Sequence, residues 1–235
     1  MNSLPLYLGH EHECAYLPGR SARMAMVPSD LVLNRELFSI LVAHGFRRSG
    51  ELVYRTYCED CAACVPIRVP VERFRPNRSQ RRVQRLNAGL QVVERPPEFH
   101  ATHYALYRAY QQERHPGGDM SQATAEDYMD FLGNTRWEGT RFFEFREQDR
   151  VLAVAVADQL VDGFSAVYTF YDPAEVRRGL GTFAVLWEIE EALRRGMSHV
   201  YLGFWIQASR KMSYKSGFRP FQILTCSGWV DGPGP

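Results

Sequence analysis

The spacing of hydrophobic and polar residues predicts several amphipathic helices. In each of them apolar residues recur three and four positions apart, which places them on one helix face. Asp30 suits the position before the first helix and Gly45 the position after it. Thr124, with Asp127 three residues later, suits the start of another. The predicted helices span residues 30–44, 99–114, 125–132 and 182–195, and a further helix carries Lys211 and Lys215.

Apolar segments between these helices predict strands. They span residues 52–55, 65–69, 141–147, 151–157, 164–171 and 199–206. Pro66 favours the edge of a sheet for the second of them, because proline has no amide hydrogen to donate. The helix at 182–195 should bury Leu186, Ile189 and Leu193 against the strands. On its other side, Glu190 with Arg194 and Glu191 with Arg195 have the spacing of ion pairs.

Strands and helices in mixed order predict an α+β fold of two parts. Pro96 and Pro97 are the best candidates for a boundary, because consecutive prolines interrupt regular structure. We therefore expect a smaller N-terminal α+β domain at 1–96, which carries most cysteines and a basic run, and a second domain at 97–235.

Composition indicates a folded protein of the cytoplasm. Of the 235 residues, 45% are hydrophobic and 13% aromatic, which is enough for a core. The N-terminus lacks a cationic segment followed by an apolar one, and no stretch reaches transmembrane length, so no membrane association is expected. Five cysteines, an odd number, fit a reducing compartment.

Nearly all of the cationic side chains are arginines. Lysine occurs twice, at Lys211 and Lys215, although lysine and arginine together number 28. Four positions apart on a helix, the two ammonium groups would share a face. This pairing favours a functional role there, whereas an ordinary solvated helix face is the alternative.

Three cysteines form a dense cluster with the spacing of metal ligands. Cys58, Cys61 and Cys64 are each three residues apart, and Cys14 or His12 could supply a fourth ligand. This predicts zinc or an iron–sulfur cluster, and ordinary packing of buried thiols is the alternative. Cys226 lies far from the others and is expected to be structural.

Two segments have the chemistry of phosphate binding. The run from Arg73 to Arg85 mixes arginine with Asn, Gln and Ser, as an RNA backbone requires, although a solvated loop is the alternative. Gly179 and Gly181 begin a helix after a strand, where backbone amides bind anions. The arrangement resembles the N-acetyltransferase-like (GNAT) fold, whose pattern is Arg/Gln-x-x-Gly-x-Gly/Ala. Here Val176 takes the expected cationic position, which favours an acyl donor other than coenzyme A.

The motifs together resemble the arginyl-tRNA–protein transferase family, and within it a short bacterial branch. The match runs nearly end to end and keeps its order. It includes CAYLPGRSAR at 14–23, GFRRSG at 45–50, residues 54–68, 74–85, 114–115 and 118–120, SAVYTFYDP at 165–173, YLGFWI at 201–206, RKMSYK at 210–215 and residues 218–220.

The resemblance implies an aminoacyltransferase of the N-degron pathway. It would move leucine from Leu-tRNA to the α-amine of proteins that begin with Asp or Glu and so mark them for degradation. The implied fold is a GNAT-like catalytic domain joined to the N-terminal cysteine domain. Eukaryotic relatives have a first Cys-x-x-Cys motif associated with an iron–sulfur cluster, whereas here Leu17 takes the place of the second cysteine. No cofactor is required for the chemistry itself.

In GNAT-like enzymes the acyl group lies between two splayed strands, which implies roles for residues on the matching strands. Aminoacyl transfer needs an ester held near an amine and a route for the proton. The residues expected to line the catalytic site are Tyr168, Tyr171, Asp172, Tyr201 and Trp205, with Tyr214 as a proton donor.

The two substrates demand cations. Guanidinium groups could read the acceptor's Asp or Glu side chain, and Arg20, Arg23, Arg47, Arg48 and Arg78 are the candidates. The residues expected to bind tRNA are Arg78, Arg81, Arg82, Arg85, Gly179, Gly181, Arg210, Lys211 and Lys215.

Other functions stay open at this stage. Arginine could be the transferred residue in place of leucine, because pocket walls cannot be read from spacing. A coenzyme-A-dependent N-acetyltransferase would share the architecture. A metal-bound RNA-binding module without catalysis would explain the cysteines and the basic run.

Overall fold

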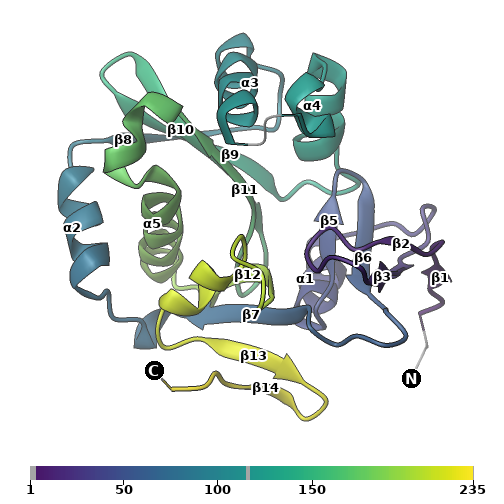
Figure 1. Ribbon diagram of the computed structural model, residues 1–235. Coiled ribbons are helices and arrows are strands. Elements are labelled where there is room, and N and C mark those ends of the chain that lie inside the picture. Colours follow the sequence, from purple (N-terminus) through teal and green to yellow (C-terminus); the bar gives the residue numbers. More distant parts are fainter. Residues whose placement is uncertain (1–3, 115–116, 235) are drawn as a thin grey trace.

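The computed structural model describes residues 4–114 and 117–234, which form two sheets and a small two-stranded ribbon. His115, which is part of the family resemblance at 114–115, lies outside the described residues. Within the described parts, no helix is both long and apolar enough to cross a membrane. The purple N-terminal elements gather on one side of the molecule and the large sheet occupies the rest (Figure 1).

The N-terminal part is built on a four-stranded sheet beside one helix. Its strand order is β1-β4-β6-β5, and all of its pairs are antiparallel. Phe38 of the helix is fully buried in a cluster that includes Trp137. The elements are β1 (Tyr7–Leu8), β4 (Met24–Met26), α1 (Arg35–Ala43), β5 (Arg47–Ser49) and β6 (Leu52–Thr56), with the ribbon β2 (His12–Glu13) and β3 (Ser21–Ala22).

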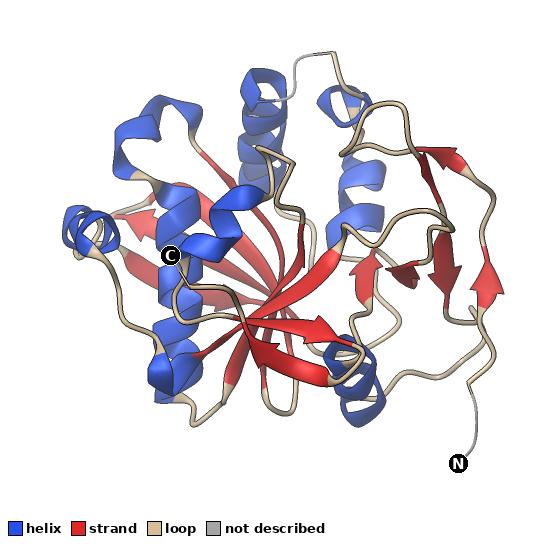
Figure 2. Cartoon of the chain, turned by 60° about the horizontal axis from the view of Figure 1, so that its bottom comes forward, coloured by secondary structure: helices blue, strands red, loops and turns tan. Residues whose placement is uncertain are grey.

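An eight-stranded sheet forms the centre of the molecule. Its order is β14-β13-β7-β12-β11-β10-β9-β8, in which β11 and β12 are parallel and the other neighbours antiparallel. Figure 2 shows its strands fanning apart between helices. The strands are β7 (Val65–Pro70), β8 (Gln91–Arg95), β9 (Thr140–Glu147), β10 (Arg150–Gln159), β11 (Gly163–Tyr171), β12 (His199–Trp205), β13 (Gln222–Thr225) and β14 (Gly228–Asp231).

Helices cover both faces of this sheet (Figure 1). On one face α5 (Leu180–Arg194) packs through a large apolar cluster, with α2 (Arg78–Leu86) beside it. On the other face lie α3 (Ala101–Arg114) and α4 (Ala125–Leu132), packed through aromatic residues. Short 3-10 helices connect these elements: η1 (Val71–Arg73), η2 (Asp119–Gln122), η3 (Pro173–Arg178) and η4 (Ser213–Gly217).

Within the described residues, the sequence located α1, α3, α4 and α5 and the strands β6, β7, β9, β10, β11 and β12, but it missed α2 and the other strands. Capping residues explain where several helices begin. Thr124 and Asp127 form the predicted capping box of α4. The helix expected from Asp30 begins later, because the Asn34 side chain accepts from the Leu37 amide at 2.8 Å. The segment from Arg73 is no open loop, since Asn77 and Gln80 form a capping box and α2 follows.

Three expectations about individual residues are wrong. β7 is an interior strand, and Pro66 is tolerated because β13 pairs with Ile67 and Arg68 and stops short of it. Leu193 is 50% exposed, so it lies outside the buried stripe of α5. Glu190 accepts from Gln84 rather than Arg194, whereas the predicted Glu191–Arg195 pair is present at 2.6 Å.

The predicted lysine helix is also wrong. Lys211 lies in a turn and Lys215 in η4, so the two share no helix face. Lys211 is exposed and Lys215 is buried.

The large sheet takes strands from both sides of Pro96 and Pro97. β7 and β8 precede these prolines, and β7 lies between β13 and β12, which follow them. The two parts of the chain therefore share one sheet, and residues from both can meet within it.

Candidate functional site

The two parallel strands of the large sheet separate after a short paired stretch. β11 pairs with β12 from Gly163 to Ser165, opposite His199 to Tyr201. β12 then shifts register against β7 between Tyr201 and Gly203, where Gly203 has a φ of 76°. Beyond this point β11 stays paired with β10, and β12 with β7. The predicted splay is present, and we call the space between residues 166–171 and 202–205 the strand gap.

Arg47 of the N-terminal sheet reaches into the strand gap. Its Nη2 donates to the carbonyl oxygen of Ala166 at 2.7 Å, on the β11 side. On the β12 side its guanidinium lies against Gly203, where an added Cβ would stand 2.6 Å from its Cζ. Nη1 is buried and has no hydrogen-bond partner among the described residues. Loss of hydration lowers the pKa of Arg47, and one guanidinium hydrogen-bonding edge stays free for a ligand.

Glu188 is a buried acid that the sequence interpretation missed. It lies on α5 and is 1% exposed, and neither carboxylate oxygen has a hydrogen-bond partner among the described residues. Burial raises its pKa to about 8, and the charge of Arg47 opposes that rise. One signal was available: Glu188 falls four residues from both Ala184 and Ala192, on the apolar face of its helix.

Lys215 also points inward. Its Nζ donates to the carbonyl oxygen of Phe204 on β12 at 2.7 Å, and the residue is 8% exposed. Burial, and next the positive charge of Arg47, lower its pKa to about 7. This placement does not fit the predicted contact of Lys215 with tRNA, because a buried ammonium group that donates to a backbone carbonyl is not free to meet a phosphate.

Tyr214, the predicted proton donor, lies next to this group. Burial of its hydroxyl and the negative charge of Glu188 raise its pKa to about 12, although 54% of the residue's surface is exposed. Arg47, Glu188, Lys215 and Tyr214 therefore act on one another electrostatically around the strand gap. The fold brings these four residues together from three elements, β5, α5 and η4.

The predicted residues on β11 divide between the two faces of the sheet. Tyr168 packs among aromatic side chains of α3 and α4, and its hydroxyl accepts from Gln111 at 2.9 Å. Tyr171 faces α5, where its ring lies close to Gly181. Asp172 accepts from the Ala174 amide at 2.9 Å and so starts η3, while also pairing with Arg150. Asp172 thus has a clear structural role.

The predicted residues on β12 are divided in the same way. Trp205 packs on the α5 side, and its Nε1 is buried without a partner among the described residues. Tyr201 packs on the opposite side, where its hydroxyl donates to Asp162 at 2.7 Å and accepts from Arg68 at 3.3 Å. Tyr201 is 2% exposed and lies where β11 and β12 are still paired. It does not fit a site in the strand gap.

The five arginines predicted as candidates for the acceptor carboxylate have different surroundings, and Arg78 lies on α2. Arg48 is buried and bonds both oxygens of Asp158, at 2.7 and 3.0 Å, so it does not fit this role. Neighbours in a strand face opposite ways, which explains why Arg47 and Arg48 differ. Arg23 donates to the Gly9 carbonyl at 2.9 Å. Arg20 is exposed.

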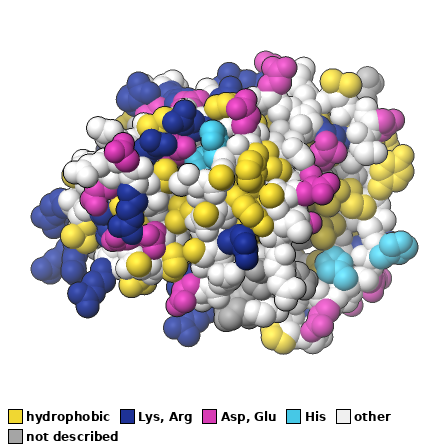
Figure 3. Space-filling view, turned by 90° about the horizontal axis from the view of Figure 1, so that it is seen from above, with side chains coloured by type: hydrophobic (Ala, Val, Ile, Leu, Met, Phe, Trp, Pro, Cys, Tyr) yellow, Lys and Arg dark blue, Asp and Glu magenta, His cyan; other side chains and the backbone are white. Residues whose placement is uncertain are grey.

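The basic run forms an exposed cationic face on α2. Arg78, Arg81, Arg82 and Arg85 are all exposed, and none of them has a salt bridge within the described parts of the chain. Figure 3 shows Lys and Arg side chains at the left edge of the molecule, the side on which α2 lies in Figure 1.

The α2 helix is joined to the segment that carries Lys211. Gln80 Nε2 donates to the carbonyl oxygen of Gly217 at 3.0 Å, and Phe74 packs near Phe218. Arg210 and Lys211 are exposed in this segment. The α2 helix therefore contacts η4, which follows the exposed cations at 210–211 in the chain.

The predicted glycine turn is packed against its neighbours. Gly179 has a φ of 65° and begins α5. An added Cβ would lie 3.2 Å from a methyl of Val83 at Gly179, and 3.3 Å from the Tyr171 ring at Gly181. Gly179 thus packs closely against α2, and Gly181 packs closely against β11. These two contacts explain both glycines without a bound phosphate.

The four predicted cysteine ligands lie near one another as free thiols. Burial raises the pKa of Cys64 to about 11, with further contributions from Cys58, Cys14 and Cys61. Among the described residues, no set of three His, Cys, Asp or Glu side chains has the arrangement of a metal site. Cys226 is exposed and far from them in sequence.

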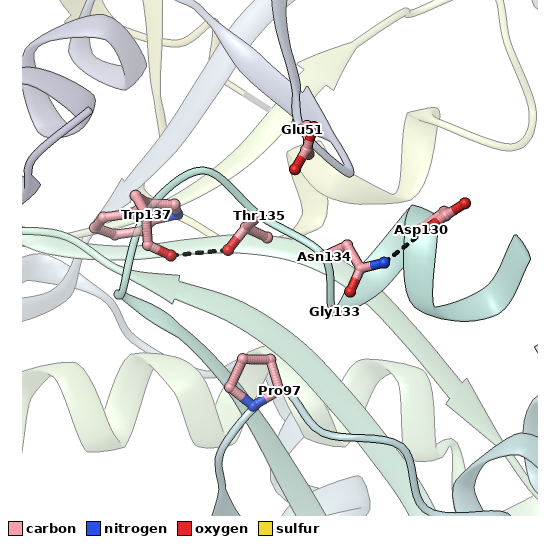
Figure 4. Close-up of a pocket in the computed structure, with 7 residues that line it drawn as sticks. All are labelled: Glu51, Pro97, Asp130, Gly133, Asn134, Thr135 and Trp137. Carbon is pink, nitrogen blue, oxygen red and sulfur yellow. Dashed lines mark hydrogen bonds between the residues drawn. The ribbon is translucent and has the colours of Figure 1, made fainter. Parts of the chain in front are cut away.

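Two open depressions of the surface are lined by residues outside the strand gap. The larger has a volume of ≈ 630 Å³ and lies between Glu51 and α4, with Pro97 and Trp137 beside it (Figure 4). Its polar groups are partly engaged with one another, since Asn134 donates to Asp130 at 2.6 Å. The smaller, of ≈ 360 Å³, includes Cys14. The larger depression contains no residue predicted for the reaction.

Two family models match the chain on either side of residues 83–101. The model described as "Arginine-tRNA-protein transferase, N terminus" matches residues 12–82, and the model "Arginine-tRNA-protein transferase, C terminus" matches residues 102–225.

Curated relatives match over nearly the whole chain. An aspartate/glutamate leucyltransferase of Chromobacterium violaceum is 46% identical over 231 residues, covering 98% of this chain and 95% of its own. One of Nitrosococcus oceani is 46% identical and covers 95% and 94%. One of Pseudomonas fluorescens is 44% identical and covers 97% and 96%.

Solved structures share the fold at low identity. L-PGS from Bacillus licheniformis has a TM-score of 0.50 at 12% identity and covers 72% of this chain. This chain spans 58% of that solved chain's length. A DUF2156 domain from Agrobacterium fabrum also has a TM-score of 0.50, at 10% identity, and covers 80% of this chain and 63% of its own.

Proposed function

The chain belongs to the arginine-tRNA-protein transferase family, and we propose that it transfers leucine from Leu-tRNA to the N-terminal α-amine of proteins that begin with Asp or Glu. The observation that carries this proposal is an identity of 44–46%, over 95–98% of the chain, to aspartate/glutamate leucyltransferases. Transfer would mark the acceptor for degradation and take place in the cytoplasm, where charged tRNA is found.

The catalytic part is a GNAT-like fold whose strand gap is completed by the N-terminal part. The parallel pair β11 and β12, the Gly179 turn and α5 follow one another as that fold requires. The Arg47 guanidinium occupies part of the gap between Ala166 and Gly203.

We assign the cationic face of α2 and the segment 210–211 to the tRNA. Arginines without carboxylate partners gain most from phosphate contacts, because no salt bridge has to be broken first. The Gln80–Gly217 hydrogen bond joins this face to η4, which carries Tyr214 at the strand gap. A tRNA bound along α2 would therefore bring its aminoacyl end toward the gap.

We assign recognition of the acceptor's acidic side chain to Arg47. Its unpartnered Nη1 is a buried donor next to the gap, where a carboxylate could accept a charge-assisted hydrogen bond. A neutral side chain at this place would leave the donor unpaired, which costs free energy and gives selectivity. Arg20 and Arg23 stay candidates for more distant contacts with the acceptor.

Positioning supplies most of the catalysis in this proposal. The leucyl ester is already activated, so holding it near a free amine accounts for much of the barrier reduction. The unpartnered Nε1 of Trp205, on a strand that borders the gap, is the donor that we assign to the oxyanion. Tyr214 is the candidate that returns a proton to the leaving ribose hydroxyl.

The four N-terminal cysteines are proposed as ligands of zinc or an iron–sulfur cluster that serves structure, since transfer itself needs no cofactor. Support comes from the electrostatic contact of Cys14, Cys58 and Cys61 with Cys64. A bound metal would require the thiols to close around it, because no three described His, Cys, Asp or Glu residues have metal-site geometry. Metal analysis of protein purified without oxygen, compared with Cys61→Ser, tests this assignment.

One assay tests the function and its leading alternatives. Purified protein is given a mixture of charged tRNAs and peptides that begin with Asp, Glu, Lys or Ala, and products are weighed by mass spectrometry. The proposal expects leucine on the Asp and Glu peptides. Added arginine would support the other donor, and transfer from acetyl coenzyme A would support an N-acetyltransferase. No transfer to any peptide would contradict the proposal.

A further inference from the structure

Glu188 is a charged group whose position packing does not explain. It occupies the buried face of α5, four residues from Ala184 and from Ala192, which are both fully buried. Its two carboxylate oxygens are unpartnered among the described residues. An unpaired carboxyl in the interior costs free energy that an apolar residue of similar size would avoid, so its presence calls for a ligand.

The surroundings of Glu188 are suited to a cationic ligand. Glu188 lies close enough to Arg47 for the two charges to interact, so an acid and a cation that both have unused hydrogen-bonding capacity lie near the strand gap. Thr169, Tyr171 and Trp205, on the strands that border the gap, are partly exposed. Solvent therefore reaches these three side chains at the border of the gap, and a ligand with an ammonium and a carboxylate group would satisfy both Glu188 and Arg47.

We propose that the Glu188 carboxylate binds the α-ammonium group of the acceptor protein in the strand gap and removes its proton before the amine attacks the leucyl ester. The proposal rests on the function proposed above. It completes the recognition of an N-terminal Asp or Glu, because Arg47 would bind the side-chain carboxylate while Glu188 binds the ammonium group.

The proton balance of this step is simple. The ammonium group gives one proton to Glu188, and the free amine attacks the ester carbonyl to form the new C–N bond. Collapse of the intermediate breaks the ester C–O bond, and a second proton from nitrogen reaches the ribose oxygen. Glu188 then releases its proton to solvent. Its pKa of about 8 matches the 7.7–8.0 of an unperturbed α-amine, so the transfer is nearly balanced.

Binding of the ammonium group is tested with a matched pair of peptides. One begins with Asp, and the other begins with a succinyl group, which keeps the side-chain carboxylate but lacks the amine. Inhibition constants for both are measured against a labelled Asp acceptor with wild type, Glu188→Gln and Glu188→Asp. Glu190→Gln, an exposed acid on the same helix, is the control.

The wild type should prefer the Asp peptide over the succinyl peptide by about tenfold or more, as a charge-assisted contact allows. Glu188→Gln should lose this preference, and its kcat/KM for the acceptor should fall by about 10²–10³-fold with an unchanged KM for Leu-tRNA. Glu188→Asp should restore part of both. If Glu188→Gln fails to fold, two measurements still test whether Glu188 binds the ammonium group. They are the preference of the wild type for the Asp peptide over the succinyl peptide, and the reduction of that preference in Glu188→Asp.

Three outcomes would overturn the inference. They are equal inhibition by both peptides in wild type, a preference that persists in Glu188→Gln, and a loss of activity that Glu190→Gln shares. Failure of the proposed function is distinct, since the wild type would then transfer no leucine at all.

Discussion

The guanidinium of Arg47 lies against the backbone of Gly203, although the two residues belong to different sheets. A Cβ at position 203 would stand 2.6 Å from the Arg47 Cζ, and Gly203 also has a φ of 76°. A side chain there and the present position of Arg47 are therefore incompatible.

Gly203→Ala should displace Arg47 from the strand gap. We expect kcat/KM for an Asp peptide to fall by about 10²-fold, because misplacing a positioning group by an ångström has effects of this size. Gly196→Ala is the control, since Gly196 has a φ of 70° but nothing within 4 Å of an added Cβ. Both variants should lose about 1–2 kcal/mol of stability from backbone strain. Equal activity in the two variants would contradict the role of Arg47.

The neighbouring residues Arg47 and Arg48 show how far the sequence can predict this site. The predicted strand in this region begins at residue 52, so the sequence interpretation missed β5 and the alternation of the two arginines along it. Which one enters the gap depends on how the N-terminal sheet docks on the large sheet, and no local pattern contains that information. Helix ends, by contrast, depend on nearby capping residues. The sequence therefore correctly predicts Thr124 as the residue that caps the start of α4.

The same limit explains Glu188 and Lys215. An acid on the apolar face of a predicted helix is a visible exception, but its partners come from elements distant in sequence. The sequence predicts Lys215 to be a surface cation, because it lies four residues after Lys211 and the two would share one face of a helix. Its burial follows from the fold of η4 onto β12, where Phe204 offers a carbonyl oxygen.

Arg48→Ala should destabilise the protein rather than weaken acceptor binding selectively. Removing it leaves Asp158 buried without its charge partner, which costs about 3–5 kcal/mol. Urea denaturation measures this loss. Arg73→Ala, which breaks the exposed Arg73–Asp231 pair, is the control and should leave stability nearly unchanged. If the Arg48→Ala protein were stable and only its KM for Asp peptides were raised, Arg48 would bind the acceptor carboxylate, as the sequence predicts.

Lys211 and Lys215 should give opposite phenotypes. Lys211→Ala should raise the KM for Leu-tRNA and leave the unfolding curve unchanged, because the residue is exposed. Lys215→Ala should lower stability by about 1–3 kcal/mol, because it leaves the Phe204 carbonyl without its donor. Transfer rates at limiting Leu-tRNA and urea curves distinguish the two. An unchanged rate for Lys211→Ala would remove Lys211 from the tRNA surface.

The arginines of α2 should contribute to tRNA affinity through salt-dependent contacts. Replacing Arg81 and Arg82 together by Ala should weaken tRNA binding and reduce the slope of log K against log salt by about 1.4–1.8, if each residue meets one phosphate. Arg194→Ala is the control, since Arg194 is also exposed but pairs with Glu191. Filter binding at several salt concentrations measures the slopes. Equal slopes for the double variant and wild type would place the tRNA elsewhere.

Glu188 should make stability depend on pH in a recognisable direction. Its pKa in the folded protein is about 8, well above the ordinary 4.5, so the folded chain keeps a proton that the unfolded chain releases between these values. The associated stability is complete below pH 4.5 and is lost as pH rises toward 8. Its greatest slope is about 1.4 kcal/mol per pH unit.

Glu188→Gln removes this titration, so its stability relative to wild type should increase steadily from pH 5 to pH 8. The charged and titratable groups that face Glu188 are Arg47 from β5 and Tyr214 from η4, and both are unchanged in the variant. Lys215 and His103 have lowered pKa values, which act in the opposite direction, but they contribute equally to both proteins. Urea curves at each pH therefore isolate Glu188 by difference. A constant difference across this range would mean that the carboxyl is charged throughout, as in a closed ion pair with Arg47, and that it is too weak a base to take the proton of the acceptor ammonium group.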